Sequence, residues 1–139
     1  MNRIPLWLRV AAWGAVLVWA STIFWLSSRT GPEIEELNVF EISDKIAHFA
    51  AFFAGAVPLY LALKWSFPEA ASRTLLLTIG YIAIYGAIDE THQLFTVNRS
   101  GADIYDWTAD ALGGAAGALA TRFLYARFSR SSRFAPAGN

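Results

Sequence analysis

The sequence lacks cysteine and carries little charge. None of its 139 residues is Cys, which excludes disulfides, Cys-ligated zinc and a thiol nucleophile. Only 16% of the residues are charged and 55% are hydrophobic, whereas a soluble globular domain carries about 25% charged residues. This deficit favours lipid as the solvent for much of a chain whose length suits one domain. The formal net charge is zero, so it gives no indication of a nucleic-acid partner, and we expect none.

Long uncharged stretches predict transmembrane helices, because about 20 apolar residues are needed to cross a bilayer. The first stretch, from Val10 to Ser28, has 19 uncharged residues. A signal-peptide core has about 7–15, so we interpret this stretch as a retained helix. We expect an all-α integral membrane protein, a bundle of four transmembrane helices that forms a single domain over residues 1–139. The helices are expected at about residues 8–28, 45–64, 73–95 and 104–126, followed by a disordered tail at 129–139.

The distribution of Lys and Arg predicts how these helices are oriented. Eight of the 11 basic residues fall on the side that carries both termini, namely Arg3, Arg9, Lys64, Arg73, Arg122, Arg127, Arg130 and Arg133. The other three are Arg29, Lys45 and Arg99. Of the 11 acidic residues, only Glu69 lies on the Arg-rich side. Since basic residues concentrate in cytoplasmic loops, we expect a multi-pass protein of the bacterial inner membrane with both termini in the cytoplasm.

Three polar motifs that are remote in the sequence are expected together at the outer face of the membrane. They lie at the start of the second helix, at the end of the third and at the start of the fourth. They comprise Asp44, Lys45 and His48, then Asp89, Glu90 and Gln93, then Arg99, Asp106 and Asp110. Ionisable groups at membrane depth are costly and normally face a partner or a water-filled cavity, so this grouping indicates a site. Gly113 and Gly117 continue the stripe of Asp110 as a small-xxx-small pair, which predicts close packing against another helix.

The residue types suit chemistry on a phosphorylated head group at the membrane surface. Asp44 lies one helical turn before His48 and could orient it as a general base. Arg99 and Lys45 could hold a phosphate. Clustered carboxylates could hold a divalent cation, and the candidates are Glu90, Asp106 and Asp110. The sequence gives no evident cofactor and leaves this cation as an option.

Taken together, these motifs resemble the VanZ family of membrane proteins, named for a protein associated with resistance to the glycopeptide teicoplanin. The matching pattern runs from Asp44 to Gly117, with Asp110 where the family pattern often has Asn. The resemblance implies membrane enzymes that act on lipid head groups, with His48, Asp44, Glu90 and Asp106 as the catalytic residues. It also implies that Lys45, Gln93 and Arg99 belong to the site, and we expect substrate-binding roles for these three together with Asp89 and Asp110.

Two classes of function remain open at this point. The first is a lipid head-group transferase or hydrolase, or a protein that binds the head group of a phospholipid or lipid-linked envelope precursor. The second is a non-enzymatic membrane protein that binds a lipid or a glycopeptide antibiotic, or supports a partner, with a polar cluster that is structural. A homodimer is compatible with either. His92 and Asp103 are expected outside the site, as an interfacial residue and as a loop or N-cap residue.

Overall fold

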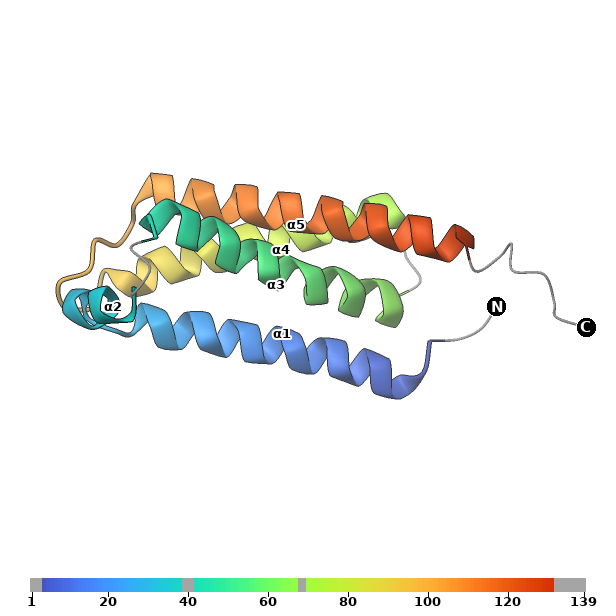
Figure 1. Cartoon of the computed structure of the whole chain (residues 1–139), viewed down its shortest axis with the longest axis horizontal. Helices are drawn as coiled ribbons and strands as arrows, with labels where there is room; N and C mark the ends of the chain where they lie inside the picture. The colour runs from blue at the N-terminus through green and yellow to red at the C-terminus, as the bar shows by residue number, and fades with distance from the viewer. Residues whose placement is uncertain (1–3, 39–41, 68–69, 132–139) are drawn as a thin grey trace, which may run out of the picture.

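The computed structural model describes residues 4–38, 42–67 and 70–131. Every regular element in these segments is a helix, so the prediction of an all-α chain is confirmed for the described residues. The elements are α1 (Leu6–Ser27), α2 (Gly31–Leu37), α3 (Asp44–Ser66), α4 (Ala71–Gln93) and α5 (Ile104–Ser131) (Figure 1). The tail expected from residue 129 starts within α5, and residues 132–139 lie outside the described part of the chain.

Helix α2 lies between the first two helices expected from the sequence, in a segment where no helix was expected. Proline is tolerated in the first turn of a helix, where its missing N–H costs no hydrogen bond. The Glu33 carboxylate accepts hydrogen bonds from the Thr30 backbone N–H (2.7 Å) and hydroxyl (2.9 Å), and these bonds lower the pKa of Glu33. The sequence Thr30-Gly-Pro-Glu33 therefore begins a helix instead of preventing one.

Three helices, α1, α3 and α4, are long and apolar enough to cross a membrane. Large hydrophobic side chains such as Leu17, Val18, Leu76 and Ile84 are exposed on them, as lipid-facing residues would be. Helix α5 is longer but is not among the three, so the expectation of four spans is not confirmed. Its apolar residues are largely Ala and Gly, which are only weakly hydrophobic, and they are interrupted by charged side chains.

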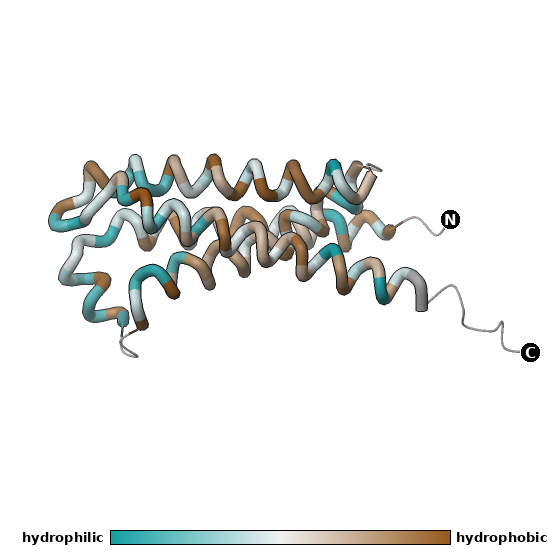
Figure 2. Tube along the Cα trace, turned by 90° about the horizontal axis from the view of Figure 1, so that it is seen from above, coloured by the Kyte–Doolittle hydropathy of each residue, from teal (hydrophilic) through white to brown (hydrophobic). Residues whose placement is uncertain are grey.

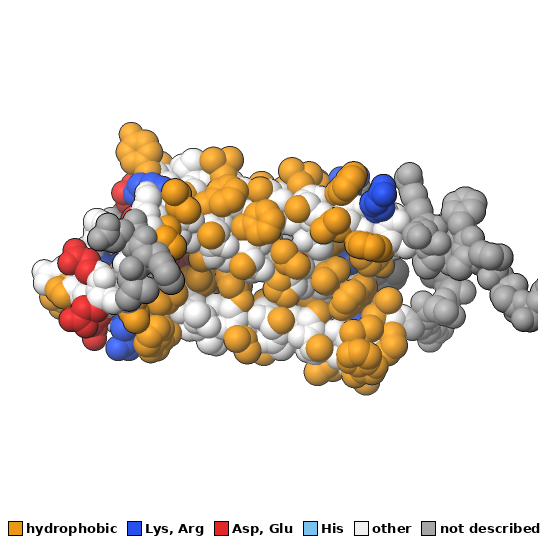
Figure 3. Space-filling view, viewed as in Figure 1, with side chains coloured by type: hydrophobic (Ala, Val, Ile, Leu, Met, Phe, Trp, Pro, Cys, Tyr) orange, Lys and Arg blue, Asp and Glu red, His pale blue; other side chains and the backbone are white. Residues whose placement is uncertain are grey.

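The four long helices run side by side along the molecule (Figure 1). Helix α3 packs against α1, α4 and α5, and α5 also packs against α4. The first turn of α1 and the last turn of α5 lie at one end of the bundle, and α2 lies at the other. Figure 2 shows hydrophilic residues concentrated toward the two ends. On the face shown in Figure 3, the acidic side chains gather at the α2 end, and hydrophobic side chains cover much of the length.

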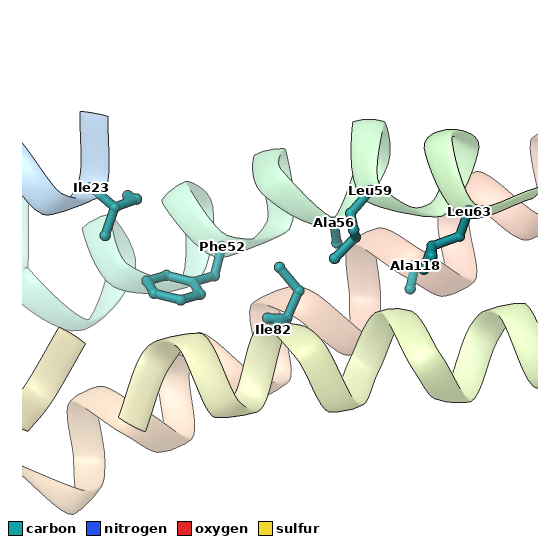
Figure 4. Close-up of a cluster of buried hydrophobic side chains, with 7 residues drawn as sticks. All are labelled: Ile23, Phe52, Ala56, Leu59, Leu63, Ile82 and Ala118. Atoms are coloured by element: carbon teal, nitrogen blue, oxygen red, sulfur yellow. The ribbon is translucent and has the colours of Figure 1, made fainter. Parts of the chain in front are cut away.

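The hydrophobic core lies between α3, α4 and α5, with one contribution from α1. Its buried members are Ile23, Phe52, Ala56, Leu59, Leu63, Ile82 and Ala118 (Figure 4). Trp19 packs against the core and donates its indole N–H to the Ala51 carbonyl at 2.9 Å. This packing fixes the axial positions of the helices, and thereby fixes which polar side chains meet at the α2 end.

Helices α3 and α5 make the most extensive contact in the molecule, and glycine makes it close. A Cβ added at Gly113 would overlap the carbonyl oxygen of Phe49, and one added at Gly117 would overlap that of Phe53. Both overlaps are with backbone atoms, which cannot rotate away. The small-xxx-small stripe of α5 therefore faces the backbone of α3 at a separation that no larger residue permits.

We predict that Gly113→Ala destabilises the protein. Overpacking a well-packed contact costs about 1–3 kcal/mol, and here only a movement of α5 away from α3 relieves it. The measurement is the thermal unfolding temperature in detergent. Gly80→Ala is the matched control, because a Cβ at Gly80 meets nothing within 4 Å and Ala is the better helix former. Equal unfolding temperatures for the two variants would contradict the prediction.

Candidate functional site

The polar side chains of three helix ends converge at the α2 end of the bundle. They come from the first turns of α3, the last turns of α4 and the first turns of α5. The buried polar members are Asp89, Glu90, Gln93, Asp106 and Asp110. Residues separated by more than sixty positions are thus in contact, as the His48–Asp110 and Lys45–Asp106 bonds show.

Lys45 is bound to two carboxylates at the start of α5. Its ammonium donates to Asp106 Oδ1 and, at 3.0 Å, to Asp103 Oδ2. Asp106 is only 2% exposed, so Lys45 supplies the counter-charge that its buried carboxylate requires. Lys45 also lowers the pKa of Asp103. These bonds link α3 to α5. They also use the Lys45 ammonium, for which the sequence suggested a role in substrate binding.

His48 is oriented by Asp110 rather than by Asp44. Its Nδ1 lies 2.9 Å from Asp110 Oδ1, a hydrogen-bond distance, whereas its Nε2 lies 3.8 Å from Asp44 Oδ1, which is too long for one. The Asp110 side chain is 0% exposed and that of Asp44 is 61% exposed. The helical spacing correctly places Asp44 near His48, but the orienting carboxylate comes from another helix.

Glu90 and Asp110 each keep one oxygen free of hydrogen bonds. Glu90 Oε2 accepts the backbone N–H of Asp103 at 2.8 Å, and Asp110 Oδ1 is bonded to His48. Glu90 Oε1 and Asp110 Oδ2 are buried, with no partner among the described residues. Gly86 leaves room for the Asp110 carboxylate, because a Cβ on residue 86 would lie 2.9 Å from Asp110 Oδ2.

A second hydrogen-bonded chain joins α1, α4 and the loop before α5. Asp89 accepts from Ser27 Oγ through Oδ1 and from Gln93 Nε2 through Oδ2, the latter at 2.9 Å. Gln93 Oε1 in turn accepts from Arg99 Nη2 at 2.8 Å. The chain holds the Arg99 guanidinium in place. Ser27 was missed from the sequence, and its only signal was a hydroxyl at the end of an otherwise apolar helix.

The loop that carries Arg99 folds back on α4. The Ala102 N–H donates to the Glu90 carbonyl at 3.1 Å, and a Cβ on Gly101 would overlap the backbone of Leu94. Asn98 and Ala102 both adopt positive φ, at 57° and 56°, which is uncommon for residues other than glycine. These contacts fix the short connection and bring Arg99 beside the end of α4.

A cavity of about 480 Å³ opens beside these groups, within the usual range for small-molecule sites of roughly 300–1,000 Å³. Polar lining residues include Asp44, His48, Asp89, Gln93, Asn98, Arg99 and Ser100. Apolar lining residues from α1, α2 and α3 include Ile23, Leu26, Ile34, Leu37 and Phe52. Of the sequence-predicted site residues, Lys45, Glu90, Asp106 and Asp110 are not among the described residues that line it.

His92 and Asp103 occupy the positions outside the cavity that the sequence suggested. His92 Nε2 lies 3.2 Å from Ser28 Oγ, and its ring packs edge-on against Phe24. Asp103 Oδ1 accepts the N–H of Tyr105 at 2.7 Å, the local bond expected of a residue that precedes a helix. Neither side chain is among the described residues that line the cavity.

Two sets of side chains bring potential metal-ligand atoms within 4.8 Å of one another. One set is Asp44, His48 and Asp106, and the other is His48, Glu90 and Asp110. Both sets contain the His48 imidazole, whereas the cation site expected from the sequence consisted of carboxylates alone. Asp106, one of those candidates, is bonded instead to Lys45.

The long apolar helices and the polar groups at one end of the bundle together define a multi-pass membrane protein. Among protein families, the VanZ/LLP1 model matches residues 9–125. The chain therefore belongs to the VanZ/LLP1 family, which confirms the resemblance found in the polar motifs. Comparison with curated proteins and with solved structures gave no match.

We predict that Lys45→Met destabilises the protein because it leaves the buried Asp106 carboxylate without its cation. An unsatisfied buried group costs about 1–3 kcal/mol, and a charged one more. Thermal unfolding in detergent measures the loss. Adding Asp106→Asn to Lys45→Met should restore most of it, since the neutral amide needs no counter-charge. A single variant as stable as the wild type would show that the Lys45–Asp106 pair contributes nothing to stability.

Proposed function

We propose that the cavity binds the head group of a phospholipid or of a lipid-linked cell-envelope precursor. The observation that carries this proposal is that charged and polar side chains line the cavity together with a set of apolar ones. A ligand with a charged head and an apolar body contacts both kinds of side chain favourably. A fully soluble metabolite would place its polar groups against the apolar ones.

Arg99 is the residue best placed to recognise the head group. Its guanidinium lines the cavity and is held by Gln93, which is itself held by Asp89. A guanidinium fixed in this way retains further N–H donors for a phosphate and loses little conformational freedom on binding. Asp44 also lines the cavity, and its exposed carboxylate suits a cationic or hydroxyl group of the same ligand.

His48 gives this site a group for proton transfer, as a head-group transferase or hydrolase would need. Its imidazole lines the cavity, and Asp110 binds one ring nitrogen. A carboxylate in this position fixes the tautomer of the ring and raises its basicity, which suits a general base. In this proposal Asp110 positions His48, and Asp44 faces the ligand.

We also propose that all four long helices cross a bacterial inner membrane, with the cavity at its outer face and both termini in the cytoplasm. The basic residues at the end opposite α2 support this orientation: Arg9, Lys64, Arg73, Arg122 and Arg127. On the face drawn in Figure 3, the acidic side chains lie at the α2 end. Helix α3 gives the two acidic side chains of α5, Asp106 and Asp110, partners inside the bundle, which makes a fourth span acceptable despite its composition.

We predict that Arg99→Ala loses co-purified lipid. Lipids bound to the protein in mild detergent are identified by mass spectrometry and counted per chain. Hydrogen bonds to a charged group are worth about 1.5–3 kcal/mol, so the affinity should fall roughly 10- to 150-fold. The matched control is Arg29→Ala at the same end of the bundle, which removes an ion pair with Glu33 (3.7 Å) outside the cavity.

One head-group class retained by the wild type and by Arg29→Ala, but not by Arg99→Ala, supports the proposal. A lipid content that is the same in all three proteins argues against it. His48→Gln separates binding from turnover: it should keep the lipid, while cells that carry it should show the head-group profile of cells without the protein.

We predict that reporter fusions place the ends of the helices on the proposed sides. Alkaline phosphatase, which folds only outside the cytoplasm, should be active when fused after Asn38 or after Ser100 and inactive when fused after Phe67 or at the C-terminus. A fluorescent protein that matures only in the cytoplasm should give the opposite pattern. An active phosphatase at the C-terminus, with activity also after Ser100, would show that α5 does not cross the membrane.

A further inference from the structure

We propose that His48, Glu90 and Asp110 bind one divalent transition-metal ion, of the Zn²⁺ or Mn²⁺ class, beside the cavity. The three residues come from three different helices, α3, α4 and α5. Each offers one ligand atom, and the three atoms lie within 4.8 Å of one another. Imidazole together with two carboxylates is a donor set that Zn²⁺ and Mn²⁺ accept and that Ca²⁺, which prefers oxygen alone, does not favour.

The two unpartnered oxygens point independently to a ligand. Glu90 is 3% exposed and Asp110 is 0% exposed, yet Glu90 Oε1 and Asp110 Oδ2 have no hydrogen-bond partner among the described residues. A buried polar atom without a partner costs free energy, so each such atom in a folded protein requires an explanation. A cation bound between the two carboxylates supplies the missing partner for both.

The distances around His48 fit a shared ion. Its Nδ1 and Asp110 Oδ1 lie 2.9 Å apart, and metal–ligand bonds of about 2.1 Å place adjacent octahedral ligands at about that separation. The metal would take the place of the proton between these two atoms and would also bind Oδ2 of the same Asp110 carboxylate. Its double charge would offset the two buried carboxylates, which His48 alone balances with at most one charge.

The alternative set of Asp44, His48 and Asp106 is less suited to a cation. Asp106 Oδ1 already accepts from the Lys45 ammonium, whose charge repels a second cation at that carboxylate. The Asp44 side chain is 61% exposed and not held by a second helix. The set of His48, Glu90 and Asp110 is therefore the better cation site of the two.

The ion would replace His48 as the activating group of the proposed function, on which this step of the inference rests, because a His48 that binds the metal is no longer a free general base. Three protein ligands leave coordination positions open, as in catalytic zinc sites. His48 lines the cavity, so the ion would lie at the cavity edge. The charged residues that line the cavity are Glu35, Asp44, Asp89 and Arg99 among those described, and they do not favour an anion. A divalent ion supplies the positive charge that a phosphate group needs there.

The test is metal binding by the full chain in detergent after treatment with a chelator. Zn²⁺ and Mn²⁺ are added separately, and bound metal is counted after equilibrium dialysis. We expect one ion per chain for at least one of the two metals, with an affinity reduced at least tenfold in both Glu90→Gln and Asp110→Asn. Asp44→Asn is the matched control and should bind as the wild type does. Equal binding in all four proteins, or no binding of either metal, overturns the proposal.

A second measurement does not depend on how well the carboxylate variants fold. The chain has two His, so in His92→Asn the only imidazole is His48. Electron paramagnetic resonance of Mn²⁺ bound to this variant should show coupling to a histidine nitrogen, and the coupling should change on ¹⁵N labelling of histidine. Stoichiometric Mn²⁺ without such coupling would mean that the ion is bound elsewhere, and the assignment would fail.

Lipid analysis on the same preparations separates this inference from the proposed function. Lipid lost on Arg99→Ala, in a protein that binds neither metal, overturns the ion site alone. One ion per chain lost on Glu90→Gln, in a protein without a retained lipid class, supports the ion site and counts against the head-group proposal.

Discussion

The cost of burying ionisable groups determines the organisation of this protein. Asp89, Asp106 and Asp110 are buried at one end of a bundle whose outer surface is largely apolar, and each takes a partner from a different helix. Ser27 of α1 binds Asp89, Lys45 of α3 binds Asp106, and His48 of α3 binds Asp110. Because none of these carboxylates can lose its partner without a large penalty, one pair holds α1 to α4 and the other two hold α3 to α5. The cavity exists because these ends are held.

Close backbone contact between α3 and α5 gives these pairs their precision. The glycines of α5 allow the two helices to approach without intervening side chains, and this contact begins one turn beyond the His48–Asp110 bond. The polar pair is therefore supported by a rigid surface on its apolar side. Packing and electrostatics act on the same pair of helices, so a change in either one displaces the imidazole.

The sequence predicted the four long helices, the family and the convergence of three polar motifs, because hydropathy and the order of the motifs are read directly along the chain. It did not predict which carboxylate orients His48. Helical spacing compares only positions within one helix, and it favoured Asp44, while the rotation of α5 about its axis brings Asp110 closer. For the same reason Lys45 was assigned to substrate, although it binds Asp106. Helix α2 was missed because hydropathy finds only long apolar helices, whereas this short polar one depends on the capping pair of Thr30 and Glu33.

The part of the cavity wall that α2 contributes is less firmly packed into the protein than the parts contributed by α1, α3 and α4. Helix α2 has no buried residue within its span, and it reaches the α4–α5 loop through the bond from the Gly31 N–H to the Val97 carbonyl at 3.4 Å. Its Ile34 and Leu37 nevertheless line the cavity. Since neither is buried in the core, both can change at little cost to folding. In the proposed lipid site such changes would alter which hydrocarbon portion is accepted without altering Arg99, so that recognition of the two parts of the ligand would be assigned to separate segments of the chain.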